Sequence, residues 1–322
     1  MPVVLAHVAG ALAPVQLVVP GLLSVAYAHR AVTLRRQGRP LSGARQACFY
    51  GALILIVVTL ISPLGHVSDE LFSMHMLEHL LIADLGALLL VLGLSGPLLA
   101  PILRIRAIDR LRVLAHPAVA LPLWALDLLV WHLPVLYQAA LHHPALHALE
   151  HAMFIAAGVN MWMPLFGPLP MPAWFGNAWR LAYVIAVRLL GALLANVFLW
   201  SGTVFYPAYR GGEGYWGLDP ISDQVAAGAI VMVEGSILTL VLFAWLFLRT
   251  ADQGEQRQAL LDYAGDHGLE LSPERATRAV AAGRGGQLRD RLEARGAEAA
   301  PAPEEAPAPG RTGQAASPGP PA

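Results

Sequence analysis

Long apolar segments separated by short, arginine-containing loops are the feature that most restricts how this chain can fold. Hydrophobic residues make up 56% of its 322 residues and charged residues only 13%, about half the charged fraction of a typical soluble domain. The charges are segregated, which leaves apolar runs of about the 20 residues that a helix needs to cross a bilayer. Lipid cannot satisfy open backbone groups, and a barrel would show short alternating strands. We therefore predict an all-α, polytopic membrane protein.

The apolar runs number seven, which predicts a seven-transmembrane-helix bundle. The second run is short and the first contains Pro14 and Pro20, so the bounds of these two runs are approximate. No basic region precedes the first run, so we expect no cleaved signal peptide. The runs are Val3–Ala28, Ala47–Ile61, Leu71–Leu94, Ala118–Leu136, Leu146–Phe166, Ala182–Trp200 and Val225–Leu248.

The arginines predict the orientation of the bundle. The chain has no lysine, so all 21 basic residues are arginine, and the second and fourth loops contain none. The positive-inside rule places arginine-rich loops in the cytoplasm, which predicts an N-terminus outside and a C-terminus inside. The arginines of the first and third loops, and the one after the last run, are Arg30, Arg35, Arg36, Arg39, Arg45, Arg104, Arg106, Arg110, Arg112 and Arg249.

Composition divides the chain into three parts. Residues 1–250 form the predicted membrane domain, residues 251–298 a charged and partly helical cytoplasmic tail, and residues 299–322 a disordered tail rich in proline and alanine. In the charged tail, Pro273 after Ser272 indicates a helix start. The single cysteine, Cys48, excludes an intramolecular disulfide and a Cys-x-x-Cys motif. The sequence has no Gly-rich phosphate loop and no basic patch, so we expect no nucleic-acid partner. The apolar runs predict the lipid bilayer as the environment of the chain.

A five-residue motif occurs twice within the apolar runs. His75-Met76-Leu77-Glu78-His79 is followed by His147-Ala148-Leu149-Glu150-His151. In each copy two histidines lie four positions apart, so on a helix their imidazoles share one face, about 6 Å from each other. One helix can offer two nitrogen ligands to a metal ion at this spacing. Because ionisable side chains within a membrane are costly, they indicate a functional site.

The predicted orientation gathers eight of the 12 histidines at the outer membrane face. Four imidazoles from two facing helices, with His132 nearby, suit copper(II) or zinc, and the sulfur of Met74, Met76 and Met153 would favour copper(I). Packing remains the simpler interpretation of a single histidine or methionine. The eight histidines are His66, His75, His79, His132, His142, His143, His147 and His151.

Other functions of the same residues stay open. Glu78 and Glu150 could complete an outer shell around a metal, and matched carboxylates on two helices are also typical of di-iron redox enzymes. His79 and His151 could instead be axial ligands of a haem. Deeper in the bundle, Arg188 could form a neutralised structural pair with an acid or belong to a proton or ion path; the deeper polar residues are Asp84, Asp127, Arg188, Asn196 and Glu234.

With these residues, the chain resembles the CtaG membrane family of cytochrome c oxidase assembly factors. The resemblance covers about residues 20–249 and follows the family's order. It rests on Ser62-Pro63-Leu64, Phe72-Ser73-Met74-His75-Met76 with His79, Gly93, Pro97, His116-Pro117, Trp131-His132-Leu133-Pro134, Tyr137, His143-Pro144, His147, Glu150-His151, Phe154, Gly158, Trp162, Pro164-Leu165, Tyr206-Pro207, Tyr209, Asp223-Gln224 and Gly228.

The resemblance implies a seven-helix, multi-pass protein of the bacterial inner (plasma) membrane that is not an enzyme. It implies a role in producing active haem–copper oxidase by delivering copper, with oxidase subunits and a periplasmic copper chaperone as partners. The family's histidines match His75, His79, His132, His147 and His151 here. Glu78 replaces a more usual glutamine and Asp84 an apolar residue, which makes this site more acidic. Desaturase-type di-iron enzymes carry their histidines on the cytoplasmic face, whereas this cluster is predicted outside.

Overall fold

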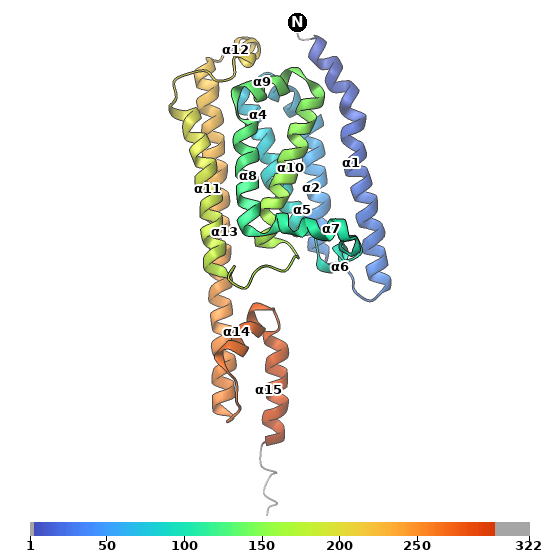
Figure 1. Ribbon diagram of the computed structural model, residues 1–322, viewed down its shortest axis with the longest axis vertical. Coiled ribbons are helices and arrows are strands. Elements are labelled where there is room, and N and C mark those ends of the chain that lie inside the picture. Colours follow the sequence, from blue (N-terminus) through green and yellow to red (C-terminus); the bar gives the residue numbers. More distant parts are fainter. Residues whose placement is uncertain (1–2, 300–322) are drawn as a thin grey trace, which may run out of the picture. The chain divides into compact units, whose positions relative to one another are not determined.

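The computed structural model describes residues 3–299, and all regular secondary structure in that part of the chain is helical (Figure 1). The prediction of an all-α protein is confirmed for these residues. The first elements in chain order are α1 (Val3–Arg36), α2 (Gly43–Ile61), α3 (Pro63–Ser68), α4 (Phe72–His79), the π-helix η1 (Leu80–Gly86), α5 (Ala87–Gly93), α6 (Gly96–Leu99), η2 (Ile102–Arg104), α7 (Arg106–Arg110) and η3 (Leu111–Ala115). They are followed by α8 (Pro117–Trp131), α9 (Pro134–His142), α10 (Pro144–Phe166), α11 (Asn177–Trp200), η4 (Pro207–Tyr209), α12 (Arg210–Trp216), α13 (Pro220–Asp266), α14 (Pro273–Ala281) and α15 (Gly285–Ala299).

Five helical segments of the described residues are long and apolar enough to cross a membrane. A sixth span results if Arg106–Ala115 and Pro117–Trp131, which meet at a 79° bend, are counted together. His116 is extended at this bend because the following proline disfavours helical geometry. The fifth predicted run forms α10, whose first half carries His147, Glu150 and His151 and is therefore less apolar. The count of seven spans and the orientation of the termini stay predictions.

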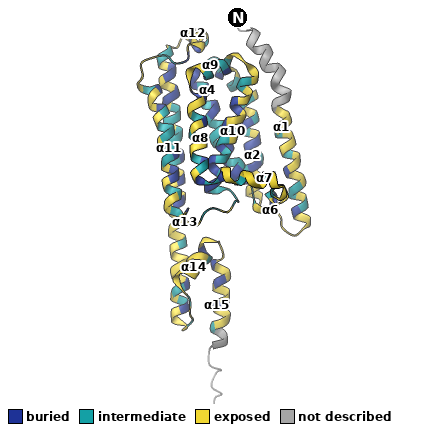
Figure 2. Ribbon diagram, in the orientation of Figure 1, coloured by how far each residue is buried: buried dark blue, intermediate teal, exposed yellow. Residues whose placement is uncertain are grey.

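The third predicted run lies at the centre of the bundle. It consists of α4, η1 and α5 in direct succession, and 56% of its most apolar window is buried, against 11% for the described part of α1. The central span packs against α2 and α10, and α10 in turn packs against α8 (Figure 2). The two helices that carry the histidine pairs are therefore neighbours in the interior of the bundle.

Apolar side chains hold this arrangement together in separate clusters. One cluster, around Trp162, joins α5 and α10 to α11. A second, aromatic cluster forms around the start of α4; its buried members are Phe72, Met76, Tyr137, Phe198, Tyr206, Tyr209 and Ala227. A third packs Tyr27 of α1 on Phe49 of α2, with ring centroids 3.9 Å apart. The aromatic cluster borders the histidines of the repeated motif, because the Tyr137 ring lies 5.3 Å from that of His75.

The described residues divide into two compact units at Leu246. The second unit has a small core of its own, formed by Leu260, Val280, Leu288 and Leu292. Its helix α14 begins at Pro273, where the sequence predicts a helix start. The preceding serine caps this helix, because its hydroxyl accepts a hydrogen bond from the amide of the residue three positions later. The tail predicted to be disordered lies, from residue 300 onward, outside the described residues.

Candidate metal centre

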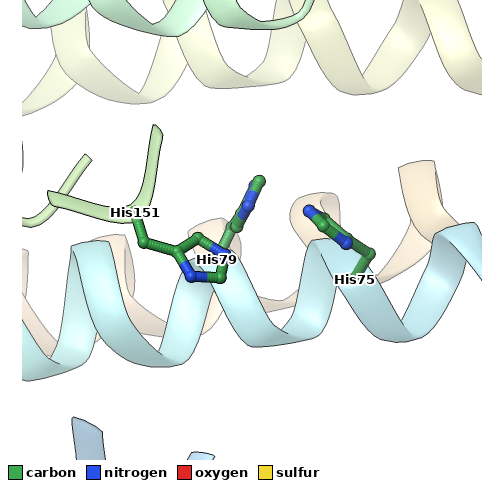
Figure 3. A group of neighbouring side chains, drawn as sticks. All are labelled: His75, His79 and His151. Carbon is green, nitrogen blue, oxygen red and sulfur yellow. The ribbon is translucent and has the colours of Figure 1, made fainter. Parts of the chain in front are cut away.

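Two helices bring the four histidines of the repeated motif together. Within α4 the rings of His75 and His79 have centroids 4.3 Å apart, and within α10 those of His147 and His151 are also 4.3 Å apart. Between the helices, His75 lies 5.2 Å from His147, and His79 lies 5.3 Å from His151. Figure 3 shows how His75 and His79 from α4 and His151 from α10 lie around the same space. The sequence prediction that the two pairs face each other agrees with this geometry.

The imidazole nitrogens at this site are buried without hydrogen-bond partners. Neither ring nitrogen of His75 or His79 has a partner, nor does Nε2 of His147 or His151. His75 is completely buried and His79 is 6% exposed. A buried polar atom without a partner costs about 1–3 kcal/mol, so several in one place require an explanation. A shared metal ion would satisfy the one lone pair that each neutral imidazole offers.

His132, at the end of α8, lies next to this group. Its ring centroid is 6.3 Å from that of His79. The Nδ1 atom lies 2.7 Å from the carbonyl oxygen of Leu128, which can only accept, so Nδ1 carries the proton. Nε2 then presents a lone pair, and it has no partner. A histidine oriented by a carbonyl through one nitrogen is the usual form of a metal ligand.

Two groups of three side chains have donor atoms close enough to hold a metal ion. The first consists of His75, His147 and Glu150, and the second of His75, His79 and His151. In each group all donor atoms lie within 4.8 Å of one another. A Zn–N or Zn–O bond of about 2.0–2.2 Å would require the side chains to contract slightly around an ion. Glu78, also buried, belongs to neither group.

The methionines occupy different surroundings. Met76 is 2% exposed and packs in the aromatic cluster with Phe72 and Tyr137. Met74 is half-buried, and Met153 is 42% exposed. The ligation of a metal by Met74 or Met76 therefore stays a prediction from the sequence, whereas the packing role of Met76 is visible.

Aromatic side chains form a wall around the histidines. The Phe154 ring lies 4.6 Å from His79, and the Tyr137 ring lies 5.3 Å from His75. The hydroxyls of Tyr137 and Tyr209 hydrogen-bond to each other at 2.9 Å, which satisfies both groups in the buried cluster. Sequence reasoning did not place these residues at the site, because nothing local distinguishes a wall residue from any other buried aromatic.

Long-range contacts fix the position of the helix pair. The Asp223 carboxylate, at the start of α13, accepts hydrogen bonds from the amides of Phe72 and Ser73 and from the Ser73 hydroxyl. It thus satisfies backbone amides at the start of α4 that have no acceptor within the helix. Further along, a Cβ atom at Gly158 would overlap the carbonyl oxygen of Ala83, so only glycine permits α10 to lie so close to η1. Both contacts keep the two histidine pairs in register.

Acidic residues lie near the start of α4. Burial raises the pKa of Asp69 to about 6, with a smaller upward contribution from Glu70 and an opposing one from His66. Burial also raises the pKa of Glu213, and the neighbouring Asp223 adds to the effect. Nearby, the Trp216 indole donates a hydrogen bond of 2.6 Å to Glu70. Carboxylates gathered at one end of the bundle favour the approach of a cation.

A second polar group lies deeper. Arg188 of α11 binds Asp84 of η1 at 2.8 Å and lies 3.7 Å from Glu234 of α13. The Trp162 indole also donates to Asp84, at 3.0 Å. The structural pair expected for Arg188 is therefore present, with Asp84 as the main partner, while Asp127 lies on α8. A cavity of about 510 Å³ extends from this group to His79 and His132.

The family of the chain follows from its sequence. Residues 25–253, more than half of the chain, match the family described as cytochrome c oxidase caa3 assembly factor (Caa3_CtaG). Searches among curated proteins and among solved structures give no match. The family indicates a factor that assists the assembly of cytochrome c oxidase and associates with that enzyme. The chain thus belongs to the cytochrome c oxidase caa3 assembly factor family.

Proposed function

We propose that the chain assists cytochrome c oxidase assembly by holding a copper ion among the histidines of α4 and α10 at the outer membrane face. The observation that supports this most strongly is the set of buried imidazole nitrogens without partners on His75, His79, His147 and His151. His132 offers a further oriented lone pair beside them.

The donor set suits copper. Neutral imidazoles bind copper, zinc and iron, and no thiolate is available because the only cysteine lies on α2. The oxidase that the family serves is a haem–copper enzyme, so copper is the metal that its assembly requires. When bound, copper would satisfy the buried lone pairs and could exchange to a partner's ligands. The oxidase subunits, and a periplasmic copper chaperone that supplies the metal, are the proposed partners in the bacterial inner membrane.

The geometry favours copper over the haem and di-iron alternatives. A porphyrin between His79 and His151 would overlap Phe154, whose ring is 4.6 Å from His79, and His75, whose ring is 4.3 Å from it. Di-iron centres in helical bundles rely mainly on carboxylates, whereas Glu150 is the one carboxylate found in the two candidate groups of the described residues. We therefore propose an accessory role without enzymatic activity of its own.

Metal analysis of the detergent-purified protein tests this function. We expect about one copper per wild-type chain. The His75→Ala/His79→Ala variant should bind copper more than about 100-fold more weakly, since loss of an outer-shell partner alone costs about 10–100-fold. In cells, the variant should lower the copper content and activity of cytochrome c oxidase while its own abundance in the membrane stays normal.

The control is His142→Ala, because His142 is exposed, its Nδ1 hydrogen-bonds to the Gln138 carbonyl oxygen, and it belongs to neither candidate metal group. This variant should bind copper and support the oxidase like the wild type. Normal oxidase copper content in cells that carry only the His75→Ala/His79→Ala variant would refute the proposal. Iron in place of copper, or a Soret absorption band, would instead support an enzyme or a haem protein.

A further inference from the structure

We propose that the histidine cluster contains two alternative metal positions that share His75, so that a metal ion moves between them while it stays bound to this residue. The proposal rests on the copper-holding function above and specifies how that site works. The first position consists of His75, His147 and Glu150, and the second of His75, His79 and His151.

The distribution of donor atoms supports two positions and not one four-histidine centre. The donor atoms separate into two groups of three, and the only side chain common to both is His75. Its ring lies 4.3 Å from His79, 5.2 Å from His147 and 6.1 Å from His151, so it is the central ring of the cluster. Both of its nitrogens lack hydrogen-bond partners, so its one lone pair is not occupied by a hydrogen bond and can ligate a metal in either group.

The two positions differ in depth. The helices α4 and α10 begin at Phe72 and Pro144, at the same end of the bundle. His75 and His147 belong to the first turns of these helices, whereas His79 and His151 follow four residues later, about 6 Å deeper. His147 is half-buried, while His75 is fully buried and His79 nearly so. A metal ion that arrives from solvent therefore meets His147 first.

The two positions also differ in donor type. The first offers a carboxyl oxygen of Glu150 beside two imidazoles. The second contains only imidazoles. Carboxylate oxygen suits harder cations, whereas imidazole nitrogen suits copper, so the all-imidazole set should hold copper more strongly. This order favours capture at the first position and storage at the second.

Transfer between the positions is a ligand exchange without electron transfer. The bonds from the metal to His147 and Glu150 break, bonds to His79 and His151 form, and the bond to His75 is kept. The oxidation state of the metal does not change. The second position also borders the cavity of about 510 Å³ through His79, next to the unpartnered Nε2 of His132.

Copper(II) loading of purified full-length variants, with pulsed EPR to count bound imidazoles, tests the proposal. The wild type should bind one copper. His79→Ala/His151→Ala should keep one copper with two imidazoles, and His147→Ala/Glu150→Gln one copper with three imidazoles. Uptake, followed by quenching of intrinsic fluorescence, should be slower in the second double variant because the position nearer to solvent is lost. His75→Ala should lose stoichiometric copper, and His142→Ala should behave like the wild type.

Several results would overturn the two positions. They are two coppers per wild-type chain, equal imidazole numbers in the two double variants, loss of copper from either double variant that remains folded, or wild-type uptake rates in His147→Ala/Glu150→Gln. Gel filtration and thermal unfolding report whether each variant is folded, and asparagine replacements at the histidines replace any alanine variant that is not. A wild-type protein that binds no copper would contradict the proposed function itself, which separates the two hypotheses.

Discussion

At the scale of single residues, the buried ionisable groups of the bundle are of two kinds. Arg188 and Asp84 satisfy each other at 2.8 Å, and their side chains are only 15% and 13% exposed. The inward-facing nitrogens of the α4 and α10 histidines have no partner in the described part of the protein. A pair that neutralises its own charge stabilises the fold, whereas unsatisfied groups in the interior require an explanation, for which we propose a bound metal. The two kinds of group therefore have different expected mutational effects.

Replacement of Arg188 tests the structural role of the deeper group. Arg188→Leu leaves Asp84 and Glu234 buried without their cation, so we expect the free energy of unfolding in detergent to fall by about 3–5 kcal/mol. In Asp84→Leu/Arg188→Leu the loss should be much smaller than the sum of the single losses, because no unpaired charge of that pair remains. Unchanged stability of Arg188→Leu, together with altered proton or ion flux, would favour a transport path instead.

At the scale of the helices, the site depends on how closely α10 approaches the central span. Gly158 permits this approach because a side chain there would overlap the backbone of η1 at Ala83. The π-helix η1 begins directly after His79. Its wider turn rotates the side chains within and after it, including Asp84, around the helix axis relative to an α-helix. π-Helical turns often occur at functional sites. The close packing of α10 on the central span therefore also brings the histidines of α10 next to those of α4.

A substitution at Gly158 should separate the two helices. Gly158→Ala adds a methyl group that the packing cannot accept, so we expect a loss of about 1–3 kcal/mol in the free energy of unfolding. Gly191→Ala is the matched control, because a Cβ atom at Gly191 of α11 meets no atom within 4 Å. In a helix interior this control should be neutral or stabilising by about 1 kcal/mol. Equal effects of the two substitutions in thermal unfolding would show that the close contact is unimportant.

At the scale of the whole molecule, function depends on which end of the bundle faces outward. The histidine pairs lie near the first turns of α4 and α10, at the end where α9 lies, and α7 with its arginines lies at the other end of α8 (Figure 1). Within residues 3–299, five helical segments have the length and composition of membrane spans. The positive-inside rule then predicts that the end with α7 faces the cytoplasm and that the candidate metal centre faces outward.

Cysteine labelling in intact cells tests this orientation. In a Cys48→Ala background, a membrane-impermeant thiol reagent should label His142→Cys of α9 and should not label Arg106→Cys of α7 until the cells are broken. Both positions are exposed, so access to the reagent depends on the side of the membrane. The reverse labelling pattern would place the histidines in the cytoplasm and contradict copper delivery at the outer face.

The sequence alone predicted much of the local structure. The apolar runs predicted helices, and the structure shows helices at each run within the described residues. By length and composition fewer than seven of them qualify as membrane spans, because α8 has only 15 residues and α10 contains polar side chains. The four-residue spacing placed each histidine pair on one helix face, since this relation depends only on helix geometry.

The tertiary structure decided what these local patterns could not. Only the packing of α4 on α10 makes His75 common to both proposed metal positions, and only the contact between η1 and α11 selects Asp84 as the partner of Arg188. The cap that Asp223 provides for α4 joins residues 151 positions apart. Spacing along one helix follows from its backbone geometry, whereas contacts between helices depend on all the side chains that pack there. The sequence by itself therefore determined which residues could bind a metal, and the tertiary structure decided how they are grouped.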